Sequence, residues 1–588
     1  MKKLKLSAIF LPTVLSVVLS GCAHAPKPVV QSEQSDQEMM DLAVVVPSMA
    51  DTEKEPVYPK QELTEEMVYT FLLADIAAQR GQKELASEAY TQLAKKTRDV
   101  RVARRAAQLG YESRQMESAL DAFKLWNELD PKASMPKQML ATMLVNGGKL
   151  EDAKPYLVEM LAADPNNAGR NFVQLYPLFL RYDDKALSHK VLNEIAQPYL
   201  RFAEIHWVLA QAAEASSQHE EAMAEISQAS NLRPEWEQPV LLRAQWLQAT
   251  KPADAMAVLK KFLIIYPEAN EVRLFYARIL LDQKLYPESR LQFQQLLKAK
   301  PENSELAFAI ALISIQMGEL DRAENELKQT LVVAKKDSST VHFYLGQLHE
   351  AKKSNAAALQ EYQQVKDGEH FFHSRLRIAY LLVKADKLNE ARAILQHTTP
   401  KNTQQSAQLI LTEGQVLRDS KQYDAAYAIL STGLEKLPDH PDLLYESAMM
   451  ADKLGKADTF EVRLRKLIKV DPDHAHAYNA LGYSLLERKG RLEEAMRLVE
   501  KAHQLAPNDA AILDSLGWGY YLTGKLGKSA EYMRRAYITY PDPEIAAHLG
   551  EVIWKQGGHD EAKNIWQDNL KKNPDSTVLK AVIKKFIP

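Results

Sequence analysis

Small and large apolar residues recur among polar ones in blocks of about 34 residues, from about residue 64 onward. Each block is long enough for two short helices, and most blocks end in a proline, which cannot continue a helix. The marker prolines are Pro131, Pro165, Pro198, Pro234, Pro267, Pro301, Pro438, Pro472, Pro507, Pro541 and Pro574. Their spacing is 33 to 36 residues, and the 137 residues between Pro301 and Pro438 equal four blocks. This constant phase indicates an array of helical repeats.

Further markers stand where this phase requires them. Twelve residues before the marker proline, where two helices would cross closely, stand Ala119, Ala153, Ala186, Ala222, Ala255, Ala426, Ala495 and Ala562, and Ala323, Ala358 and Ala391 continue the spacing. The turn between the two helices is marked by Gly148, Gly318, Gly455, Gly490, Gly524 and Gly557. Glycine is favoured there because it adopts the left-handed conformation that ends a helix.

Two more positions complete the pattern. Leu-Gly pairs, which we expect to let the first helix approach its neighbour, are Leu481-Gly482, Leu516-Gly517 and Leu549-Gly550. A large position in the second helix holds Tyr90, Phe123, Tyr362 and Trp566. This set of markers resembles the tetratricopeptide repeat. A coiled coil would need heptads unbroken by proline.

We therefore predict an all-α fold, a right-handed α-solenoid of about 15 tetratricopeptide-type helical hairpins, over residues 62–574. Residues 575–588 are expected to form a capping helix, which covers the open end of such an array. The block that ends near Pro198 fits the pattern poorly, and so do the blocks between residues 338 and 404.

The first residues are typical of a lipoprotein signal peptide, which we assign to residues 1–21. A basic segment, residues 1–5, precedes an apolar run at residues 6–19 that is shorter than the roughly 20 residues of a membrane-spanning helix. Leu19-Ser20-Gly21-Cys22 follows and resembles the lipobox of bacterial lipoproteins. Cys22 is therefore the predicted lipidation site, and a free thiol is the alternative.

Resemblance to acylated lipoproteins implies more than one acyl chain on Cys22, and several chains give stable membrane anchoring. The next residue is Ala23, whereas an Asp there resembles an inner-membrane retention signal. We expect an outer-membrane anchor with the protein on the periplasmic face. Residues 22–61 are poor in aromatic side chains and are expected to form a disordered tether.

Composition narrows the function. The chain has 74 Lys and Arg against 77 Asp and Glu, a net charge of −3, and lacks the excess positive charge of a nucleic-acid-binding protein. One cysteine permits no intrachain disulfide and no cysteine-rich metal site. No phosphate-binding Gly-Lys loop, G-x-S-x-G elbow or H-E-x-x-H helix occurs. We therefore predict no catalytic residues, no metal and no cofactor, and a protein that is not an enzyme.

Protein binding is the function that a helical solenoid serves most readily, through its long concave face. The repeat phase places Tyr483, Trp518, Tyr521 and Trp554 in the first helices of the last three hairpins, where they are candidate groove contacts. The alternative is that these rings pack between repeats. Asn479 stands near a position used by clamps for C-terminal carboxylates, but no basic residue stands in phase with it.

The first repeats, residues 71–81, 89–90 and 97–106, resemble those of proteobacterial outer-membrane lipoproteins that act as adaptors for a periplasmic carboxyl-terminal processing protease. This resemblance implies a scaffold that binds the protease and brings it protein substrates such as cell-wall hydrolases. The alternative is a scaffold lipoprotein for exopolysaccharide export or for assembly of a pilus or secretion pore. Co-purification with a serine protease or with a β-barrel would separate the two.

Overall fold

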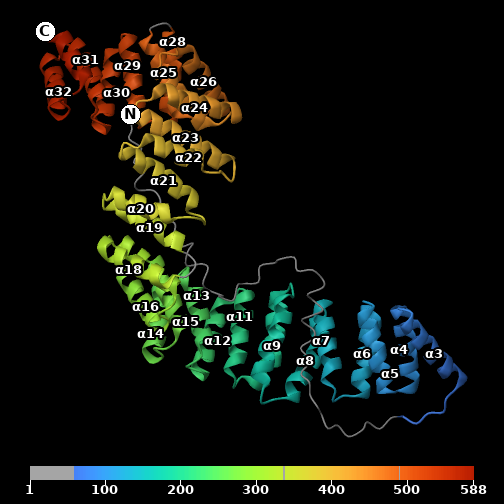
Figure 1. Ribbon diagram of the computed structural model, residues 1–588. Helices are drawn as coiled ribbons and strands as arrows, with labels where there is room; N and C mark the ends of the chain where they lie inside the picture. The colour runs from blue at the N-terminus through green and yellow to red at the C-terminus, as the bar shows by residue number, and fades with distance from the viewer. Residues whose placement is uncertain (1–58, 335–337, 489–490, 588) are drawn as a thin grey trace. The chain divides into compact units, whose positions relative to one another are not determined.

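The structure is a computed structural model that describes residues 59–334, 338–488 and 491–587. These residues form 31 α-helices and one short 3-10 helix, and contain no strand (Figure 1). From α3 to α32, odd-numbered helices are the first (A) helices of successive hairpins and even-numbered helices are the second (B) helices. The predicted fold class, an all-α solenoid of about 15 hairpins, is confirmed.

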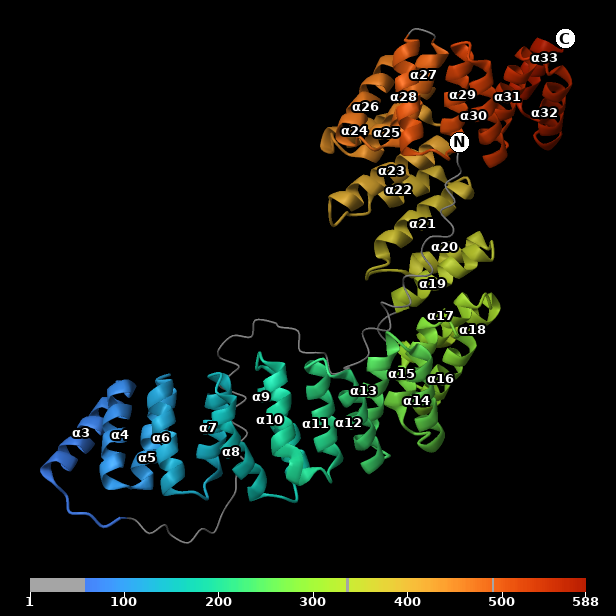
Figure 2. The same cartoon turned by 180° about the vertical axis from the view of Figure 1, so that it is seen from behind.

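The helices belong to two compact units, in each of which the hairpins stand side by side in chain order (Figure 2). The first unit ends at Glu319 and contains α3 (Glu65–Gln79), α4 (Lys83–Thr97), α5 (Val100–Glu112), α6 (Met116–Leu129), α7 (Ser134–Asn146), α8 (Leu150–Ala163), α9 (Ala168–Leu180), α10 (Lys185–Ala196), η2 (Gln197–Tyr199), α11 (Ala203–Ala215), α12 (His219–Leu232), α13 (Glu237–Gln248), α14 (Pro252–Ile265), α15 (Asn270–Asp282), α16 (Tyr286–Ala299) and α17 (Ser304–Gln316).

The second unit begins at Leu320. It contains α18 (Leu320–Val333), α19 (Ser338–Ala351), α20 (Asn355–Gln364), α21 (Phe371–Lys384), α22 (Leu388–Gln396), α23 (Thr403–Asp419), α24 (Tyr423–Lys436), α25 (Pro441–Lys453), α26 (Ala457–Val470), α27 (Ala475–Glu487), α28 (Leu492–Leu505), α29 (Ala510–Leu522), α30 (Leu526–Thr539), α31 (Pro543–Lys555), α32 (His559–Lys572) and α33 (Thr577–Phe586).

A buried and mostly small residue occupies the fourth position of every B helix in the described residues. These residues are Ala86, Ala119, Ala153, Ser188, Ala222, Ala255, Ser289, Ala323, Ala358, Ala391, Ala426, Phe460, Ala495, Ser529 and Ala562. A small side chain lets two helices approach closely while the interior stays densely packed. Serine serves this purpose in three hairpins, and Phe460 is the one large exception among them.

Ala186 does not take this position, contrary to the prediction, and its side chain is exposed. Its place is filled by Ser188, which is buried. The physical reason is that α10 has 12 residues whereas α8 has 14. The distance from the first residue of the helix to the marker proline is therefore two residues shorter for α10 and Pro198 than for α8 and Pro165. Counting back from the proline therefore reaches the second residue of α10 instead of the fourth.

The eighth residue of each B helix is the large position, and Tyr90, Phe123, Tyr362 and Trp566 are all buried there. The glycines of the Leu-Gly pairs face this position. A Cβ on Gly482 would lie 2.7 Å from Cγ1 of Val499, the eighth residue of α28. These glycines therefore let helix A approach helix B of its own hairpin, and not a neighbouring repeat as we expected.

The residue two positions before a B helix is left-handed in most hairpins. Among the predicted turn glycines, Gly148, Gly318, Gly455, Gly524 and Gly557 have φ between 70° and 94°, and Gly490 lies outside the described residues. The same backbone conformation is adopted without glycine, at φ between 57° and 63°, by Arg114, Ser217, Lys284, Lys353, Asp386 and Lys421. The turn geometry thus persists where the sequence marker is missing.

The poorly fitting blocks correspond to irregular hairpins. Helix α9, which contains Pro177, packs more extensively on α11 than on its partner α10, and the η2 turn follows α10. In the second region, the B helices α20 and α22 have only 10 and 9 residues. The hairpins are therefore present in both regions, but their helices are short or splayed.

The predicted signal peptide, Cys22 and most of the predicted tether lie outside the described residues. In the part of the chain that the structure describes, no helix combines the length and apolar character needed to cross a membrane.

Candidate functional site

Three A helices of the second unit, α27, α29 and α31, lie side by side (Figure 2) and bring aromatic side chains together. The ring of Trp518 on α29 stacks on Tyr521, with centroids 4.9 Å apart, and on His548 of α31, with centroids 4.3 Å apart. The ring of Tyr483 on α27 lies 6.4 Å from that of His548. These four residues, here named the aromatic face, include three of the four residues that the sequence predicts as groove contacts.

The repeat phase explains why these residues share one face. Tyr483 and Trp518 each follow the glycine of a Leu-Gly pair, and that glycine faces helix B. A step of one residue turns the side chain by about 100° around the helix axis, away from helix B. Both rings are consequently half-buried, with part of their surface open to solvent.

Carboxylates surround the aromatic face and hold two of its polar atoms. The indole Nε1 of Trp518 donates a hydrogen bond of 2.9 Å to Glu487 Oε1. The hydroxyl of Tyr521 donates one of 3.0 Å to Glu551 Oε1, and Lys585 Nζ lies 2.9 Å from the same oxygen. Burial, together with the charge of Glu551, raises the pKa of Tyr521 to about 12. The orientation of both rings is thus fixed by acidic side chains.

Nearby carboxylates shift the pKa values of His548 and Tyr483. His548 Nδ1 lies 2.9 Å from Asp514 Oδ2. Burial of the imidazole lowers its pKa, but the charges of Asp514, Glu544 and Glu487 outweigh this effect and hold the pKa above its ordinary value. Burial and the same three carboxylates raise the pKa of the Tyr483 hydroxyl. Burial is the largest cause of the Tyr483 shift, whereas the carboxylates alone account for the raised pKa of His548.

Trp554, the fourth predicted contact, packs elsewhere. Its ring centroid lies 5.8 Å from that of Trp566 on α32, 5.7 Å from that of Phe586 on α33 and 4.3 Å from that of His559. Helix α33 packs on both α31 and α32. Trp554 therefore takes part in packing between the last hairpin and α33, which is the second of the two alternatives that the sequence left open.

The sequence did not identify His548 and Asp514 as members of this site. Each is an isolated polar residue in an A helix, and neither belongs to a known motif. The available signal was their separation of 34 residues, which is one repeat period. Their positions in the two A helices differ by one residue, since Asp514 stands three residues before Gly517 and His548 two before Gly550. A spacing near one period still places an acid and a histidine on neighbouring hairpins where they can meet.

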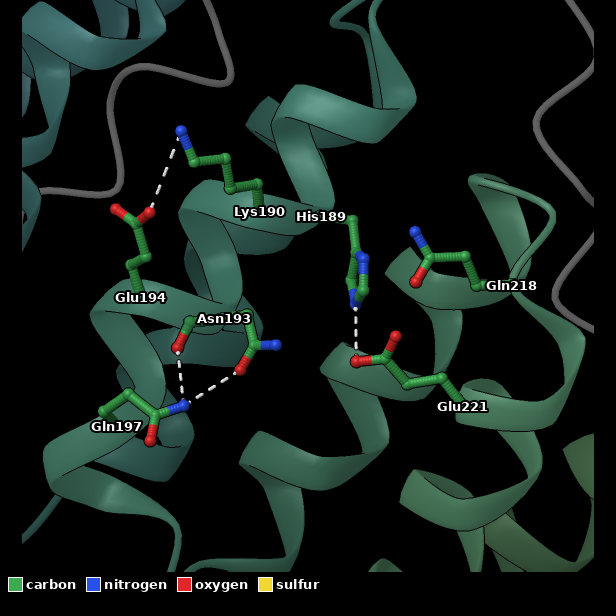
Figure 3. A pocket seen from close by; sticks show the side chains of 7 residues that line it. All are labelled: His189, Lys190, Asn193, Glu194, Gln197, Gln218 and Glu221. Atoms are coloured by element: carbon green, nitrogen blue, oxygen red, sulfur yellow. Dashed lines mark hydrogen bonds and ion pairs between the residues drawn. The ribbon is translucent and has the colours of Figure 1, made fainter.

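A second feature is an open hollow of about 380 Å³ between B helices of the first unit (Figure 3). Its walls are His189, Lys190, Asn193 and Glu194 of α10, Gln197 of η2, and Gln218 and Glu221 at the start of α12. The hollow lies at the irregular α9/α10 hairpin.

Some polar groups in this hollow contact one another, although His189 Nε2 makes no hydrogen bond. The ring of His189 points towards Glu221, and its Nε2 lies 3.4 Å from Oε1 of that carboxylate (Figure 3). Gln197 Nε2 donates a hydrogen bond of 3.0 Å to Asn193 Oδ1. No Phe, Tyr or Trp ring lines the hollow, so the aromatic face is the stronger candidate for protein recognition.

Within residues 59–334, 338–488 and 491–587, no three His, Cys, Asp or Glu residues are placed to hold one metal ion. The predicted lipidation site, Cys22, lies outside these ranges.

The helical hairpins match known repeat proteins in sequence. Two family profiles, each described as Tetratricopeptide repeat, match the chain, one at residues 417–482 and the other at residues 247–304, 308–368 and 463–510. The chain is similar to TPR repeat-containing protein PA4667 of Pseudomonas aeruginosa, with 33% identity over 489 residues that cover 83% of this chain and 82% of the relative.

Two other similarities are weaker. TPR repeat-containing protein YpiA of Bacillus subtilis is 20% identical over 369 residues, which cover 55% of this chain and 86% of YpiA. The crystal structure of TTC0263, a thermophilic TPR protein of Thermus thermophilus, aligns with a TM-score of 0.28 at 25% identity, covering 32% of this chain and 99% of that one. This chain belongs to the tetratricopeptide-repeat protein family, as shown by its series of helical hairpins, the two matching family profiles and the similarity to the Pseudomonas protein.

Proposed function

We propose that the chain is an outer-membrane-anchored scaffold on the periplasmic side, which binds a carboxyl-terminal processing protease and presents protein substrates such as cell-wall hydrolases. Tetratricopeptide repeats are protein–protein interaction modules, and the chain is such a scaffold in general terms. The observation that carries the proposal is the aromatic face, because half-exposed Trp and Tyr side chains on a rigid support are typical anchors of protein interfaces.

The proposed location rests on the sequence. A basic segment and a short apolar run precede Leu19-Ser20-Gly21-Cys22, and Ala23 follows the cysteine. A lipid-modified Cys22 would keep the repeats at a membrane, since several acyl chains give stable anchoring. Residues 23–58 would then separate the first hairpin from the membrane surface.

The proposed partner rests on the resemblance of the first repeats, residues 71–81, 89–90 and 97–106, to the protease adaptors. These residues lie mostly in the helices α3, α4 and α5. A scaffold of this kind raises the rate of proteolysis by holding enzyme and substrate together, since tethering increases the effective concentration of one for the other.

The test is affinity purification of the tagged full chain from detergent-solubilised envelopes, followed by mass spectrometry. We expect a carboxyl-terminal processing protease together with cell-wall hydrolases. The purified protease should then degrade one of these hydrolases faster when the purified chain is added. Recovery of an outer-membrane barrel or polysaccharide-export proteins without the protease would reject the adaptor and favour the export or secretion scaffold.

A further inference from the structure

Two buried hydrogen-bond acceptors at the aromatic face have no donor. Asp514 Oδ1 is buried without a hydrogen-bond partner, although the other carboxylate oxygen binds His548, and the Asp514 side chain is only 9% exposed. Asn479 Oδ1 on α27 is likewise buried and unpartnered. Leaving such acceptors unsatisfied costs on the order of 1–3 kcal/mol each, so a missing partner should be a hydrogen-bond donor.

The two acceptors occupy the same place in neighbouring hairpins. Asn479 and Asp514 each stand three residues before the glycine of their Leu-Gly pair. In the same helices, Tyr483 and Trp518 follow one helical turn later and therefore lie on the same side. The buried acceptors and the rings thus lie along the same side of α27 and α29.

The charge of this surface is negative. The carboxylates of Glu487, Asp514, Glu544 and Glu551 act on its histidine and tyrosines, and Lys585 and His548 already contact Glu551 and Asp514. Glu487 and Glu544 are not buried. A cationic ligand would therefore be attracted, and an anionic one repelled.

We infer that the aromatic face of α27, α29 and α31 binds an arginine-bearing basic segment of a protein partner, an inference that rests on the proposed scaffold function. A guanidinium has five N–H donors and stacks on aromatic rings, so one side chain can pair with the exposed carboxylates of Glu487 and Glu544 and stack on the half-buried rings. The chemistry is the reverse of a carboxylate clamp, which presents cations and donors to a C-terminal carboxylate.

The test measures binding of synthetic peptides to the purified full chain by fluorescence anisotropy. The probe is a fluorescein-labelled peptide of about a dozen residues with two arginines spaced by Gly and Ala. Its two matched controls carry citrulline, which keeps the shape but not the charge, or glutamate. We expect the arginine peptide to bind at least about tenfold more tightly than either control, and more weakly at high salt because exposed charges are screened.

Variants locate the site. Asp514→Asn and Glu487→Gln each remove one charge but keep an acceptor oxygen, and each should weaken binding of the arginine peptide by about fivefold to tenfold. Glu487 is not buried, so its variant should fold normally even if Asp514→Asn does not. The matched control is Glu493→Gln, because Glu493 lies on the B helix α28, away from the aromatic face, and should leave binding unchanged.

Equal affinities for the arginine and citrulline peptides would overturn the inference. It would also be overturned if Glu487→Gln lowered the affinity for the arginine peptide no more than Glu493→Gln does. Failure of the inference is distinguishable from failure of the proposed function. Capture of the protease by a chain that does not bind the arginine peptide rejects the basic ligand alone. Specific peptide binding by a chain that captures no protease supports the basic ligand and rejects the adaptor.

Discussion

His548 and Asp514 join two neighbouring hairpins of the second unit through a hydrogen bond of 2.9 Å between Nδ1 and Oδ2. The histidine comes from α31 and the aspartate from α29, two A helices that pack against each other. Because nearby carboxylates raise the pKa of His548 in the folded protein, the pair couples the stability of these hairpins to pH.

The first prediction concerns this coupling. A raised folded-state pKa means that protonated His548 stabilises the fold fully below the pKa of an unfolded histidine, about 6.5, and that this contribution is lost as pH rises through the folded-state value. His548→Gln should therefore lower the free energy of unfolding by about 1–3 kcal/mol near pH 6 and by less near pH 9. Urea unfolding followed by circular dichroism measures both values.

The control is His476→Gln, because His476 on α27 is not buried and should change stability little at either pH. If His548→Gln lowers the free energy of unfolding equally at both pH values, the protonated imidazole is not the stabilising form.

A second prediction tests the close approach of helices A and B. A Cβ on Gly346 would lie 2.6 Å from Cε1 of Tyr362, whose ring is buried. Gly346→Ala should therefore destabilise the protein by about 1–3 kcal/mol, as overpacking does. Gly527→Ala is the matched control, since a Cβ on this helical glycine meets no atom within 4 Å. Helix propensity should make the control neutral or stabilising by up to about 1 kcal/mol, and a gain for both variants would refute the tight contact.

A third prediction uses the difference between two alanines that the sequence placed at equivalent positions. Ala153 is fully buried in α8, whereas Ala186 is exposed on α10. Ala153→Leu should cost about 1–3 kcal/mol of stability because it overfills the crossing, and Ala186→Leu should change stability by less than about 0.5 kcal/mol. Thermal melting of the two variants tests this prediction. Equal decreases in melting temperature would mean that Ala186, like Ala153, lies at the helix crossing.

The case of Ala186 shows what the sequence could and could not predict about the fold. The repeat phase was readable because helix crossings require small residues at a fixed interval, and this requirement recurs in every hairpin. The shortening of α10 was not readable, because no residue type marks a helix that ends two residues early. The place of Ser188 at the helix crossing therefore could not be predicted, although serine is nearly as small as alanine.

The candidate site shows a similar division. The repeat phase places Tyr483, Trp518 and Tyr521 in A helices, and their role as groove contacts stays a prediction. The packing of Trp554 against Phe586 could not be predicted, because it depends on how α33 docks on the last hairpin. Contacts across a docked terminal helix have no fixed spacing in the sequence, unlike contacts one repeat period apart.

A fourth prediction concerns the membrane anchor. If Cys22 carries the lipid, Cys22→Ala should leave the protein without acyl chains and remove it from the outer-membrane fraction. Metabolic labelling with a palmitate analogue and fractionation of the envelope measure both effects. A variant that stays in the outer-membrane fraction would contradict anchoring through Cys22.

The last prediction contrasts two tryptophans of the second unit. Trp518 is half-buried on the aromatic face, whereas Trp566 is fully buried and fills the large position of α32. Trp566→Leu should destabilise the protein by up to about 3–5 kcal/mol because it leaves a cavity. Trp518→Leu should lower the melting temperature less but weaken binding of the arginine peptide and capture of the protease. If Trp518→Leu instead lowers stability as much as Trp566→Leu and leaves binding unchanged, the ring of Trp518 serves packing and not recognition.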